Sequence, residues 1–354
     1  MKAIRWHARE DVRLEEIPEP QLSRPDELLL RVLLCGVCGT DVEEYRRGPA
    51  VVPATSPHPL TGRVAPITLG HEFCGEVVAA GNDVAGFRPG DVVAVEGSMH
   101  CGDCFWCLRG ELQLCRYLAQ YGLSADGGLA ELCVVRARTC LLMPPSADPK
   151  LGALLEPLSV AVRAVRRSKL VPGGTVTVFG GGPIGLLVVE VARAWGASRA
   201  VVVEPHPGRR ALALRVGASE AVDPSEDLAA LFDDLQGGGP DVTFECSGHP
   251  GTADRAVRSV RRGGRTVLVA PVPAATLDTS FLIGEKEVVA SVSHQLVADF
   301  GFGLRLVLNN TLVATDTVSE VTDLPGAMAR FFTKEPYPPS AGKVLVAPAP
   351  GALG

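Results

Sequence analysis

The sequence predicts an α/β protein of two domains, a β-rich amino-terminal domain followed by a domain with a doubly wound parallel sheet. Its 354 residues suffice for two domains at roughly 100 to 200 residues each. Residues 1–142 mix short apolar or alternating runs with turn residues, which is typical of a β-rich domain. Between Thr175 and Val292, apolar runs instead alternate with helical stretches, as they do in βαβ units.

The strands expected in the first domain are short and bounded by turn residues. We expect them over Leu28–Leu34, Glu76–Ala79, Asp91–Val95 and Leu129–Val135. The pattern changes near Leu151, where the second type of organisation begins.

The second domain should be built from parallel strands joined by helices. Helices are expected over Ile184–Trp195, Gly208–Val216 and Gly251–Val260. A helix between two strands lets both run in the same direction, so these segments predict a doubly wound sheet. The expected strands are Thr175–Phe179, Ala200–Glu204, Asp241–Glu245, Arg265–Val269 and Glu287–Ser291.

The chain after about Ser293 is too short for a third domain and is expected to fold back onto the first. It should contain helices over Phe302–Leu308 and Ala327–Phe332, a strand over Lys343–Val346, and a frayed tail over Pro348–Gly354. The predicted division is a first domain over 1–157, a second over 158–294 and a return segment over 295–354.

Charge and composition exclude several classes of protein. With 34 Lys and Arg against 40 Asp and Glu, the net charge is −6, which disfavours a general nucleic-acid-binding or anionic-membrane-binding surface. A hydrophobic fraction of 46% is typical of a folded globular protein. Met1–Trp6 lacks a signal-peptide core, and glycines, a proline and Glu190 interrupt Val176–Val191. We therefore expect a cytoplasmic protein without a membrane span.

A glycine-rich turn follows the first strand of the predicted parallel sheet. Its letters, G-G-G-P-I-G, fit the pattern G-x-G-x-x-G and lead directly into a helix that begins near Pro183 and Ile184. In such a turn Gly180 permits the sharp bend, Gly182 lets the backbone approach a pyrophosphate, and Gly185 allows close helix packing. A turn that only joins a strand to a helix is the alternative. The βαβ context favours a bound dinucleotide.

Glu204 favours NAD as that dinucleotide. It ends the next strand about 20 residues after Gly185, the spacing expected of a carboxylate that binds the ribose hydroxyls. A carboxylate there would repel the 2′-phosphate of NADP. Arg209 and Arg210 weaken this preference, because nearby cations could accommodate the phosphate. The prediction is therefore NAD, with NADP as the alternative.

Four cysteines spaced C-x2-C-x2-C-x7-C predict a metal site. Four thiolates bind zinc in a closed tetrahedral site with no open position for chemistry, so this ion would be structural. The main alternative is an iron–sulfur cluster, whose bacterial motif has a shorter last gap and a following proline. Four unrelated reduced thiols are a further alternative, and the absence of a basic helix disfavours a DNA-binding finger. These residues are Cys101, Cys104, Cys107 and Cys115.

Four more residues lie in turn or helix-start contexts in a recognisable order. Cys38 lies in C-G-T-D, His71 and Glu72 in L-G-H-E, and Glu156 in L-L-E-P-L. Together with the four cysteines and the glycine turn, this order resembles the zinc-dependent alcohol dehydrogenases of the medium-chain dehydrogenase/reductase superfamily over nearly the whole chain. The stretch from Arg47 to Glu72 and the glutamate in E-P-L resemble its polyol branch, especially the 2,3-butanediol dehydrogenases.

This resemblance implies a GroES-like catalytic domain and a Rossmann NAD-binding domain. It implies a catalytic zinc held by Cys38 and His71, with Glu72 and Glu156 as direct or water-bridged ligands. Such an ion keeps an open position and acts as a Lewis acid on the substrate oxygen while hydride passes to or from the nicotinamide ring. With the structural ion, two zinc ions per chain are expected.

The resemblance also implies a path for the substrate proton. Thr40 matches the family hydroxyl that passes this proton towards solvent, and a buried structural hydroxyl is the alternative. Family members often have a histidine five residues after the zinc cysteine, where this sequence has Glu43. Glu43 would accept the proton itself, which needs a raised carboxyl pKa near neutrality, or water would bypass it.

Several other residues receive weaker assignments. Cys246 lies in F-E-C-S-G, which resembles the family segment lining the nicotinamide pocket, so we expect it to pack near the cofactor. His294 would either tune substrate choice or be structural, and Tyr45 is a candidate pocket wall. Cys35, Cys74, Cys133 and Cys140 lie in apolar runs and are expected to be small core residues.

The predicted function is NAD- and zinc-dependent oxidation of a secondary alcohol in a diol, polyol or cyclitol-like substrate, or reduction of the matching ketone. One alternative is a dehydrogenase for another secondary alcohol, such as a sugar, an amino alcohol or a biosynthetic intermediate. Another is a non-catalytic nucleotide-binding protein, disfavoured because a sensor needs no reactive metal. By resemblance we expect a homodimer or homotetramer, with no nucleic-acid partner; an edge strand over residues 287–292 would suit a two-fold contact.

Overall fold

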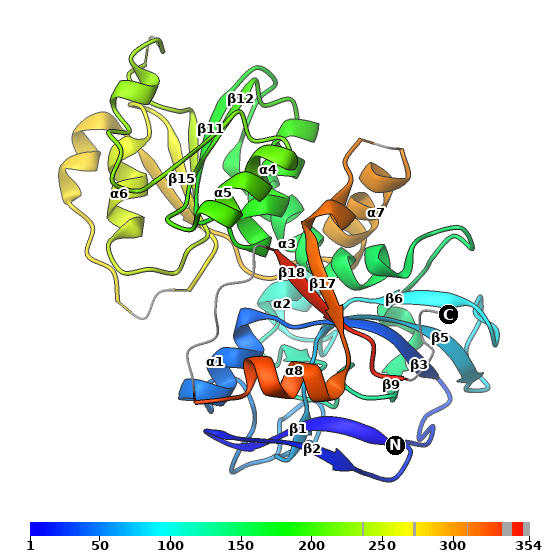
Figure 1. Ribbon diagram of the computed structural model, residues 1–354. Helices are drawn as coiled ribbons and strands as arrows, with labels where there is room; N and C mark the ends of the chain where they lie inside the picture. Colours follow the sequence, from blue (N-terminus) through cyan, green and yellow to red (C-terminus); the bar gives the residue numbers. More distant parts are fainter. Residues whose placement is uncertain (236, 272–273, 310, 335–341, 350–354) are drawn as a thin grey trace. The chain divides into compact units, whose positions relative to one another are not determined.

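A computed structural model gives the fold (Figure 1). It describes residues 1–235, 237–271, 274–309, 311–334 and 342–349. The chain divides into two compact units. The first comprises Met1–Glu156, Glu320–Pro338 and Val344–Gly354, and the second comprises Pro157–Ser319 and Pro339–Lys343.

The first unit is rich in β-structure. Its main sheet has seven strands in the order β10-β6-β5-β3-β18-β17, with β9 also paired to β3. A three-stranded sheet, β2-β1-β4, and the short pair β7-β8 complete it. The strands are β1 Lys2–Ala8, β2 Asp11–Glu16, β3 Glu27–Gly36, β4 Ile67–Thr68, β5 Glu72–Ala80, β6 Val92–Val95, β7 Ser98–Met99, β8 Ala119–Gln120, β9 Leu132–Arg136, β10 Cys140–Leu142, β17 Val318–Thr322 and β18 Lys343–Val346.

Few helices belong to the first unit. They are α1 Gly39–Arg47, the single turn α2 Phe105–Leu108, and α8 Leu324–Phe331. Helix α3, Pro149–Ser168, begins in the first unit and continues into the second. Apolar residues of α1 and α8 share one core with the sheets. Tyr45 belongs to this core and packs edge-on against Phe332 with ring centroids 5.9 Å apart. Its place in a pocket wall stays a prediction.

The second unit contains a parallel six-stranded sheet in the order β13-β12-β11-β14-β15-β16. In chain order this is 3-2-1-4-5-6, the doubly wound arrangement, and it changes direction between β11 and β14. Ligands of such sheets bind at the carboxyl ends of the strands beside that switch point. The strands are β11 Thr175–Phe179, β12 Arg199–Val203, β13 Glu220–Val222, β14 Val242–Glu245, β15 Arg265–Leu268 and β16 Glu287–Ala290.

Helices connect and cover these parallel strands. Helix α4 contacts β11 and β12, whereas α6 contacts β14 and β15. The helices are α4 Pro183–Ala194, α5 Pro207–Arg215, α6 Thr252–Ser259 and α7 Gly301–Leu308. No helix among the described residues combines the length and apolarity that a bilayer crossing requires.

The predicted strands of the second unit agree closely with those observed, and β11 and β18 match residue for residue. The sequence did not predict β1, β2, α1 or α3. Residues 295–319 also differ from expectation, because they lie with the second unit, whereas Glu320–Pro338 and the segment from Val344 lie with the first. Residues 350–354 of the expected tail lie outside the described part of the chain.

The four cysteines expected in the core are buried there. Cys35, Cys74, Cys133 and Cys140 are all buried free thiols, which confirms their interpretation as small core residues. His294 is buried as well and stacks on Phe300 with ring centroids 5.9 Å apart.

Glu190 is a buried carboxyl group in α4 and should make the stability of the fold depend on pH. Burial raises its pKa from 4.5 to about 8, which a hydrogen bond from Val313 partly offsets and the charge of Asp316 reinforces. The folded protein therefore holds a proton that the unfolded chain releases between these pH values, so stability falls as pH rises through this window.

We expect Glu190→Gln to raise Tm at pH 8 by about 2 °C or more, because glutamine needs no proton to be buried neutral. At pH 4 to 5 the variant and the wild type should differ little. Thermal unfolding at both pH values checks this, with Glu226→Gln, an exposed position, as the control. An equal shift at both pH values would contradict the titration of Glu190.

Candidate active site and metal centres

Two neighbouring strands bring Cys38 and His71 together. Strand β3 ends at Gly36, two residues before Cys38, and β5 begins at Glu72, directly after His71. In the antiparallel pairing of these strands, Gly36 lies opposite Glu72. The register therefore places Cys38 beside the His71–Glu72 pair, although the two segments are far apart in sequence.

Cys38, His71 and Glu72 form a group of potential metal ligands. Their ligand atoms all lie within 4.8 Å of one another. Zinc binds sulfur at about 2.3 Å and nitrogen or oxygen at about 2.0 to 2.2 Å, so ligands of one ion lie at separations of this size. Three protein ligands leave one position of a tetrahedral ion open for water or substrate, which is the composition of a catalytic zinc site. These residues fit such an ion.

The carboxylate of Asp41 contacts two of these three residues, Cys38 and His71. Its Oδ2 accepts a hydrogen bond from the Cys38 amide at 2.9 Å, and its Oδ1 lies 3.6 Å from Nδ1 of His71. Burial lowers the pKa of His71, but the charges of Asp41 and Cys38 outweigh it and hold that pKa well above its ordinary value. The site thus favours positive charge next to His71, and a metal cation supplies that charge without a proton.

Asp41 was not predicted as a site residue, and its substitution should weaken the metal centre. We expect Asp41→Asn to lower zinc affinity about 10- to 100-fold, because a carboxylate behind a ligating histidine orients the ring and raises its basicity. Competition with a chromogenic chelator measures this affinity. Asp11→Asn, which changes a partly exposed carboxylate of β2 in the same unit, is the control. Unchanged zinc affinity in Asp41→Asn would contradict this role.

Glu156 lies outside the three-residue group but is buried in the same unit. It is close enough to Glu96 that its charge, added to burial, raises the pKa of Glu96 to about 8. Two buried carboxyl groups so close together repel each other when both are charged, and a cation would relieve this cost. Glu96 was not predicted; its signal is a charged residue directly after the apolar strand β6.

The two residues expected to move the substrate proton differ in their surroundings. The hydroxyl of Thr40 lies 3.6 Å from the sulfur of Cys38. Glu43 lies one turn further along α1, with about half of its side chain exposed, and pairs with Arg47 at 3.6 Å. The structure therefore gives Thr40 a position beside the candidate metal ligands and Glu43 a position at the surface.

Glu44 fixes the loop that follows α1. Its side chain is buried, and its carboxylate accepts hydrogen bonds from the amides of Ala50, Val51 and Val52 at distances between 2.5 and 3.3 Å. Three main-chain donors satisfy this buried charge, so the start of the loop is held against the helix that carries Thr40. This contact was not predicted from the sequence.

The four cysteines of the C-x2-C-x2-C-x7-C motif converge on one point. Three sulfur–sulfur distances are 3.8 Å (Cys101–Cys107), 3.5 Å (Cys104–Cys107) and 3.5 Å (Cys115–Cys101). The edge of a tetrahedron of sulfurs around zinc is about 3.8 Å for a 2.3 Å bond. A [4Fe–4S] cluster would instead bind each thiolate to a different iron, which places the sulfurs further apart. This spacing therefore fits a single tetrahedral ion.

Backbone amides donate hydrogen bonds to two of these sulfurs, those of Cys104 and Cys115. Hydrogen bonds from the amides of Arg116 and Cys107 lower the pKa of Cys104 to about 6. The sulfur of Cys115 accepts hydrogen bonds from the amides of Cys101 and Tyr117, both at 3.4 Å. Because the thiolate is the form that binds metal, the amides at Cys104 favour a bound ion.

The glycines of the turn after β11 differ in what a Cβ at each would meet. Gly180 has a φ of +100°, and a Cβ there would lie 2.8 Å from the amide nitrogen of Ser247. A Cβ on Gly185 would lie 1.9 Å from the carbonyl oxygen of Gly180. A Cβ on Gly182 would meet nothing within 4 Å, so the space in front of the amino terminus of α4 is open to a ligand. A dinucleotide pyrophosphate fits that space, since Pro183 and Ile184 open a helix whose positive end faces it.

Glu204 lies beside this turn, as the spacing suggests. Its carboxylate accepts hydrogen bonds from the amides of Gly181 at 2.7 Å and His206 at 2.9 Å. Arg209 is 3.9 Å from the same carboxylate. Arg210 instead pairs with Asp223 at 3.0 Å. Arg210 also donates to the main-chain carbonyl of Glu204 at 2.8 Å, so both arginines contact Glu204, and Arg209 is the one that faces its carboxylate.

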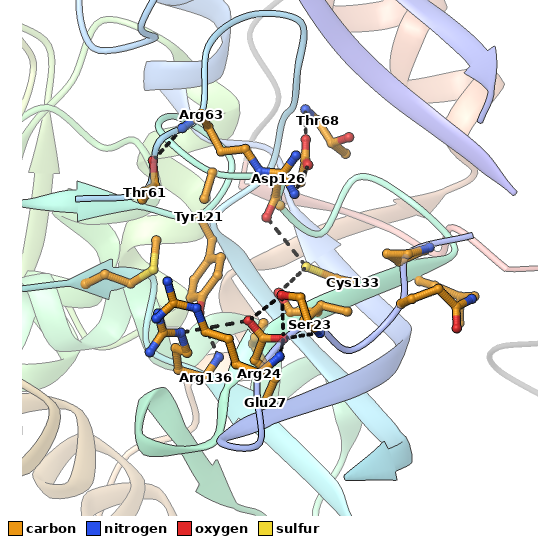
Figure 2. A pocket seen from close by; sticks show the side chains of 18 of the residues that line it. Ser23, Arg24, Glu27, Thr61, Arg63, Thr68, Tyr121, Asp126, Cys133 and Arg136 are labelled. Carbon is orange, nitrogen blue, oxygen red and sulfur yellow. Dashed lines mark hydrogen bonds and ion pairs between the residues drawn. The ribbon is translucent and has the colours of Figure 1, made fainter. Parts of the chain in front are cut away.

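A cavity of about 590 Å³ in the first unit is separate from the metal ligands (Figure 2). It is lined by residues of the β2–β3 segment, β9 and the loop before β4, and Cys38, His71 and Glu72 do not line it. Carboxylates partly neutralise its arginines: Arg63 pairs with Asp126 at 3.4 Å, and Arg136 lies 4.0 Å from Glu27. Its charges are therefore largely balanced within the protein.

Comparison with known proteins identifies the family. Residues 24–145 match the alcohol dehydrogenase GroES-like domain, and residues 183–307 match the zinc-binding dehydrogenase domain. The (R,R)-butanediol dehydrogenase of Bacillus subtilis is 41% identical over 76% of this chain and 77% of its own. The chain belongs to the zinc-binding alcohol dehydrogenase family.

Two further relatives match this chain at lower identity, over a similar or larger share of its length. The sorbitol dehydrogenase of Bacillus subtilis is 35% identical over 76% of this chain and 74% of its own. A zinc-binding dehydrogenase from Sinorhizobium meliloti, whose crystal structure is bound to NADP, superposes with a TM-score of 0.87 at 32% identity over 98% of this chain and 99% of its own. The expected GroES-like and Rossmann domains are confirmed, and the protein is a zinc-dependent oxidoreductase that acts on CH–OH groups with a nicotinamide cofactor.

Proposed function

We propose that this dehydrogenase interconverts a secondary alcohol and its ketone in a vicinal diol or polyol, with NAD as the hydride acceptor. The observation that carries this proposal is the group formed by Cys38, His71 and Glu72, a three-ligand set that leaves a zinc ion one open position. The butanediol and sorbitol relatives support the substrate class.

The catalytic roles follow from the positions of the side chains. We propose that Cys38, His71 and Glu72 would hold the catalytic zinc, with Glu156 as a further direct or water-bridged ligand. When bound, this ion supplies Lewis acidity that stabilises an alkoxide or polarises a carbonyl. Asp41 keeps the imidazole of His71 oriented. Thr40, beside Cys38, takes the proton of the substrate hydroxyl.

We propose that water completes the proton path beyond Thr40. The side chain of Glu43 is half exposed and pairs with Arg47 at the surface of α1, away from the group of metal ligands. Bulk water is accessible at this point of α1 and exchanges protons without a further side chain.

We assign the remaining sites by the same geometry. Cys101, Cys104, Cys107 and Cys115 hold a structural zinc, giving two ions per chain. The turn with Gly180, Gly182 and Gly185 receives the pyrophosphate of the cofactor, and Glu204 with Arg209 binds the adenosine ribose. The first unit is the catalytic domain and the second the nucleotide-binding domain.

Glu204 should set the preference for NAD. We expect Glu204→Gln to raise the ratio of kcat/KM for NADP to that for NAD about 10-fold, because the repulsion between a carboxylate and a 2′-phosphate disappears and Arg209 becomes available to the phosphate. Steady-state kinetics with both cofactors measure this ratio. Glu226→Gln is the control, and an unchanged ratio in Glu204→Gln would contradict the assignment.

We further propose a cytoplasmic homodimer or homotetramer. Strand β16 ends the path of the parallel sheet, and Val292, just beyond it, is about half exposed. An edge strand with exposed apolar neighbours can extend a sheet across a two-fold axis. Analytical ultracentrifugation of the zinc-loaded protein determines the oligomeric state.

The decisive test of the function is NADH formation by metal-analysed enzyme over a panel of vicinal diols, polyols and cyclitols. Turnover of at least one class that is strongest with NAD and requires both zinc ions supports the proposal. Turnover confined to an amino alcohol or a sugar would transfer the assignment to that substrate. No turnover with either cofactor at full zinc content would contradict it.

A further inference from the structure

A basic cavity lies in the second unit, near the amino ends of the parallel strands, whereas the glycine turn lies at their carboxyl ends. Its volume is about 430 Å³, and the loops that line it precede β14, β15 and β16. The glycine turn instead follows β11, at the carboxyl ends of the strands. The strands are four or five residues long, so their amino and carboxyl ends lie roughly 15 Å apart. The cavity is therefore distinct from the proposed cofactor site.

The charges that line this cavity all have one sign. Among its described lining residues are four cations and no carboxylate, whereas the whole chain has a net charge of −6. Ser280, Ile283, Val260 and three glycines complete the lining. The cations are Arg258, Arg261, Arg262 and Lys286.

Glycines allow the cationic side chains to converge. A Cβ on Gly284 would lie 3.4 Å from Cγ of Arg262 and 3.4 Å from Cε of Lys286, so both stems pass the same point. A Cβ on Gly237 would lie 2.8 Å from Cδ of Arg261. The floor of the cavity is thus open backbone with basic side chains around it.

The internal contacts of these cations leave donors available. Arg258 pairs with Asp254 at 2.6 Å and Arg261 with Asp241 at 2.7 Å, both outside the lining. The ammonium of Lys286 donates to the carbonyls of Val257 at 3.0 Å and Arg258 at 2.7 Å, which uses two of its three protons.

Arg262 is exposed, as is Arg258. Within the described part of the chain, no carboxylate forms an ion pair with Arg262. Burial and the charge of Arg262 both lower the pKa of Lys286, which shows that the two cations repel each other. An anion between them would remove this repulsion. In the cavity of Figure 2, by contrast, carboxylates belong to the lining itself, as in the pair of Arg63 with Asp126.

We propose that the cavity formed by Arg258, Arg261, Arg262 and Lys286 is a binding site for a small ligand that carries a phosphate or pyrophosphate group. Guanidinium groups match phosphate oxygens with paired donors, and lysine adds a point charge. The volume accommodates a group of this size together with a small organic portion.

The test is calorimetric titration of the zinc-loaded full chain with inorganic pyrophosphate at low ionic strength, with and without saturating NADH. We expect saturable binding that NADH does not displace and that weakens as salt increases. Parallel titrations with ADP and with a sugar bisphosphate identify the source of the phosphate, since the tighter ligand reveals which organic portion the cavity accepts. Displacement of pyrophosphate by NADH would place it at the glycine turn and overturn the proposal.

Variants locate the binding. Arg262→Gln should weaken pyrophosphate binding about 10-fold. Ser280→Asp, which adds a negative charge to the lining, should weaken it at least as much, whereas Ser280→Asn should not. Arg215→Gln, an exposed arginine of α5 outside the cavity, is the matched control. Equal affinity in all variants, or binding of an oligo-aspartate peptide in preference to every phosphate compound, would overturn the proposal.

Discussion

Replacing Cys38 by serine should leave one zinc ion per chain and lower kcat/KM about 1000-fold or more. A serine hydroxyl stays protonated and is a poor zinc ligand, so His71 and Glu72 alone would hold the catalytic ion weakly. Loss of the Lewis acid removes several kcal/mol of transition-state stabilisation, and each 1.36 kcal/mol corresponds to about a tenfold change in rate. Metal analysis and steady-state kinetics on the same preparation check both expectations.

A matched control separates metal loss from damage to the core. Cys140→Ser changes a buried core thiol of the same unit and should retain two zinc ions. Cys38→Ser should also keep a Tm within about 3 °C of the wild type, because Cys38 is only partly buried at the start of α1. Two zinc ions together with unimpaired turnover in Cys38→Ser would refute the ligand set.

Replacing Cys104 by serine should lower the stability of the protein, whereas Cys38→Ser should lower its activity. We expect one zinc ion per chain and a Tm lower by about 5 °C or more, because binding of a structural ion contributes directly to folding. The segment around α2 has little apolar burial of its own, with Phe105 and Leu108 largely exposed. Thermal unfolding with metal analysis measures this effect.

A neighbouring surface position provides the comparison for Cys104. Glu111→Gln breaks only a surface ion pair with Arg109 and should leave Tm nearly unchanged. Chelator treatment of the wild type should lower Tm as Cys104→Ser does. A Tm in Cys104→Ser equal to that of the wild type, with the ion lost, would show that this zinc does not stabilise the fold.

Local patterns in the sequence predicted the second unit well. Strand β11 is five consecutive buried residues followed by a glycine with positive φ, so its hydrophobic run and its end coincide in the sequence. Helix α3 escaped prediction because Gly152 and Pro157 interrupt its pattern. Gly152 is required there by packing, since a Cβ would lie 2.6 Å from that of Cys74. Such a tertiary contact has no local signature.

The candidate site depended more on resemblance than on local pattern. Cys38 and His71 meet through the register of β3 with β5, which no spacing in the sequence reveals. Asp41 did have a usable signal, because an acidic residue three positions after a helix start is the spacing of a capping box. That carboxylate caps the Cys38 amide and also faces His71, so one local rule covers half of its role.

Because Glu44 binds main-chain amides, the backbone path of the loop after α1 does not depend on the side chains of that loop. The carboxylate binds main-chain amides at Ala50, Val51 and Val52, and every amino acid except proline supplies such a donor. Mutations at these three positions can therefore accumulate while the loop keeps its course. Natural variation or a designed library can therefore change three side chains without changing the backbone that carries them. A fixed backbone with variable loop side chains is how one fold acquires new specificities.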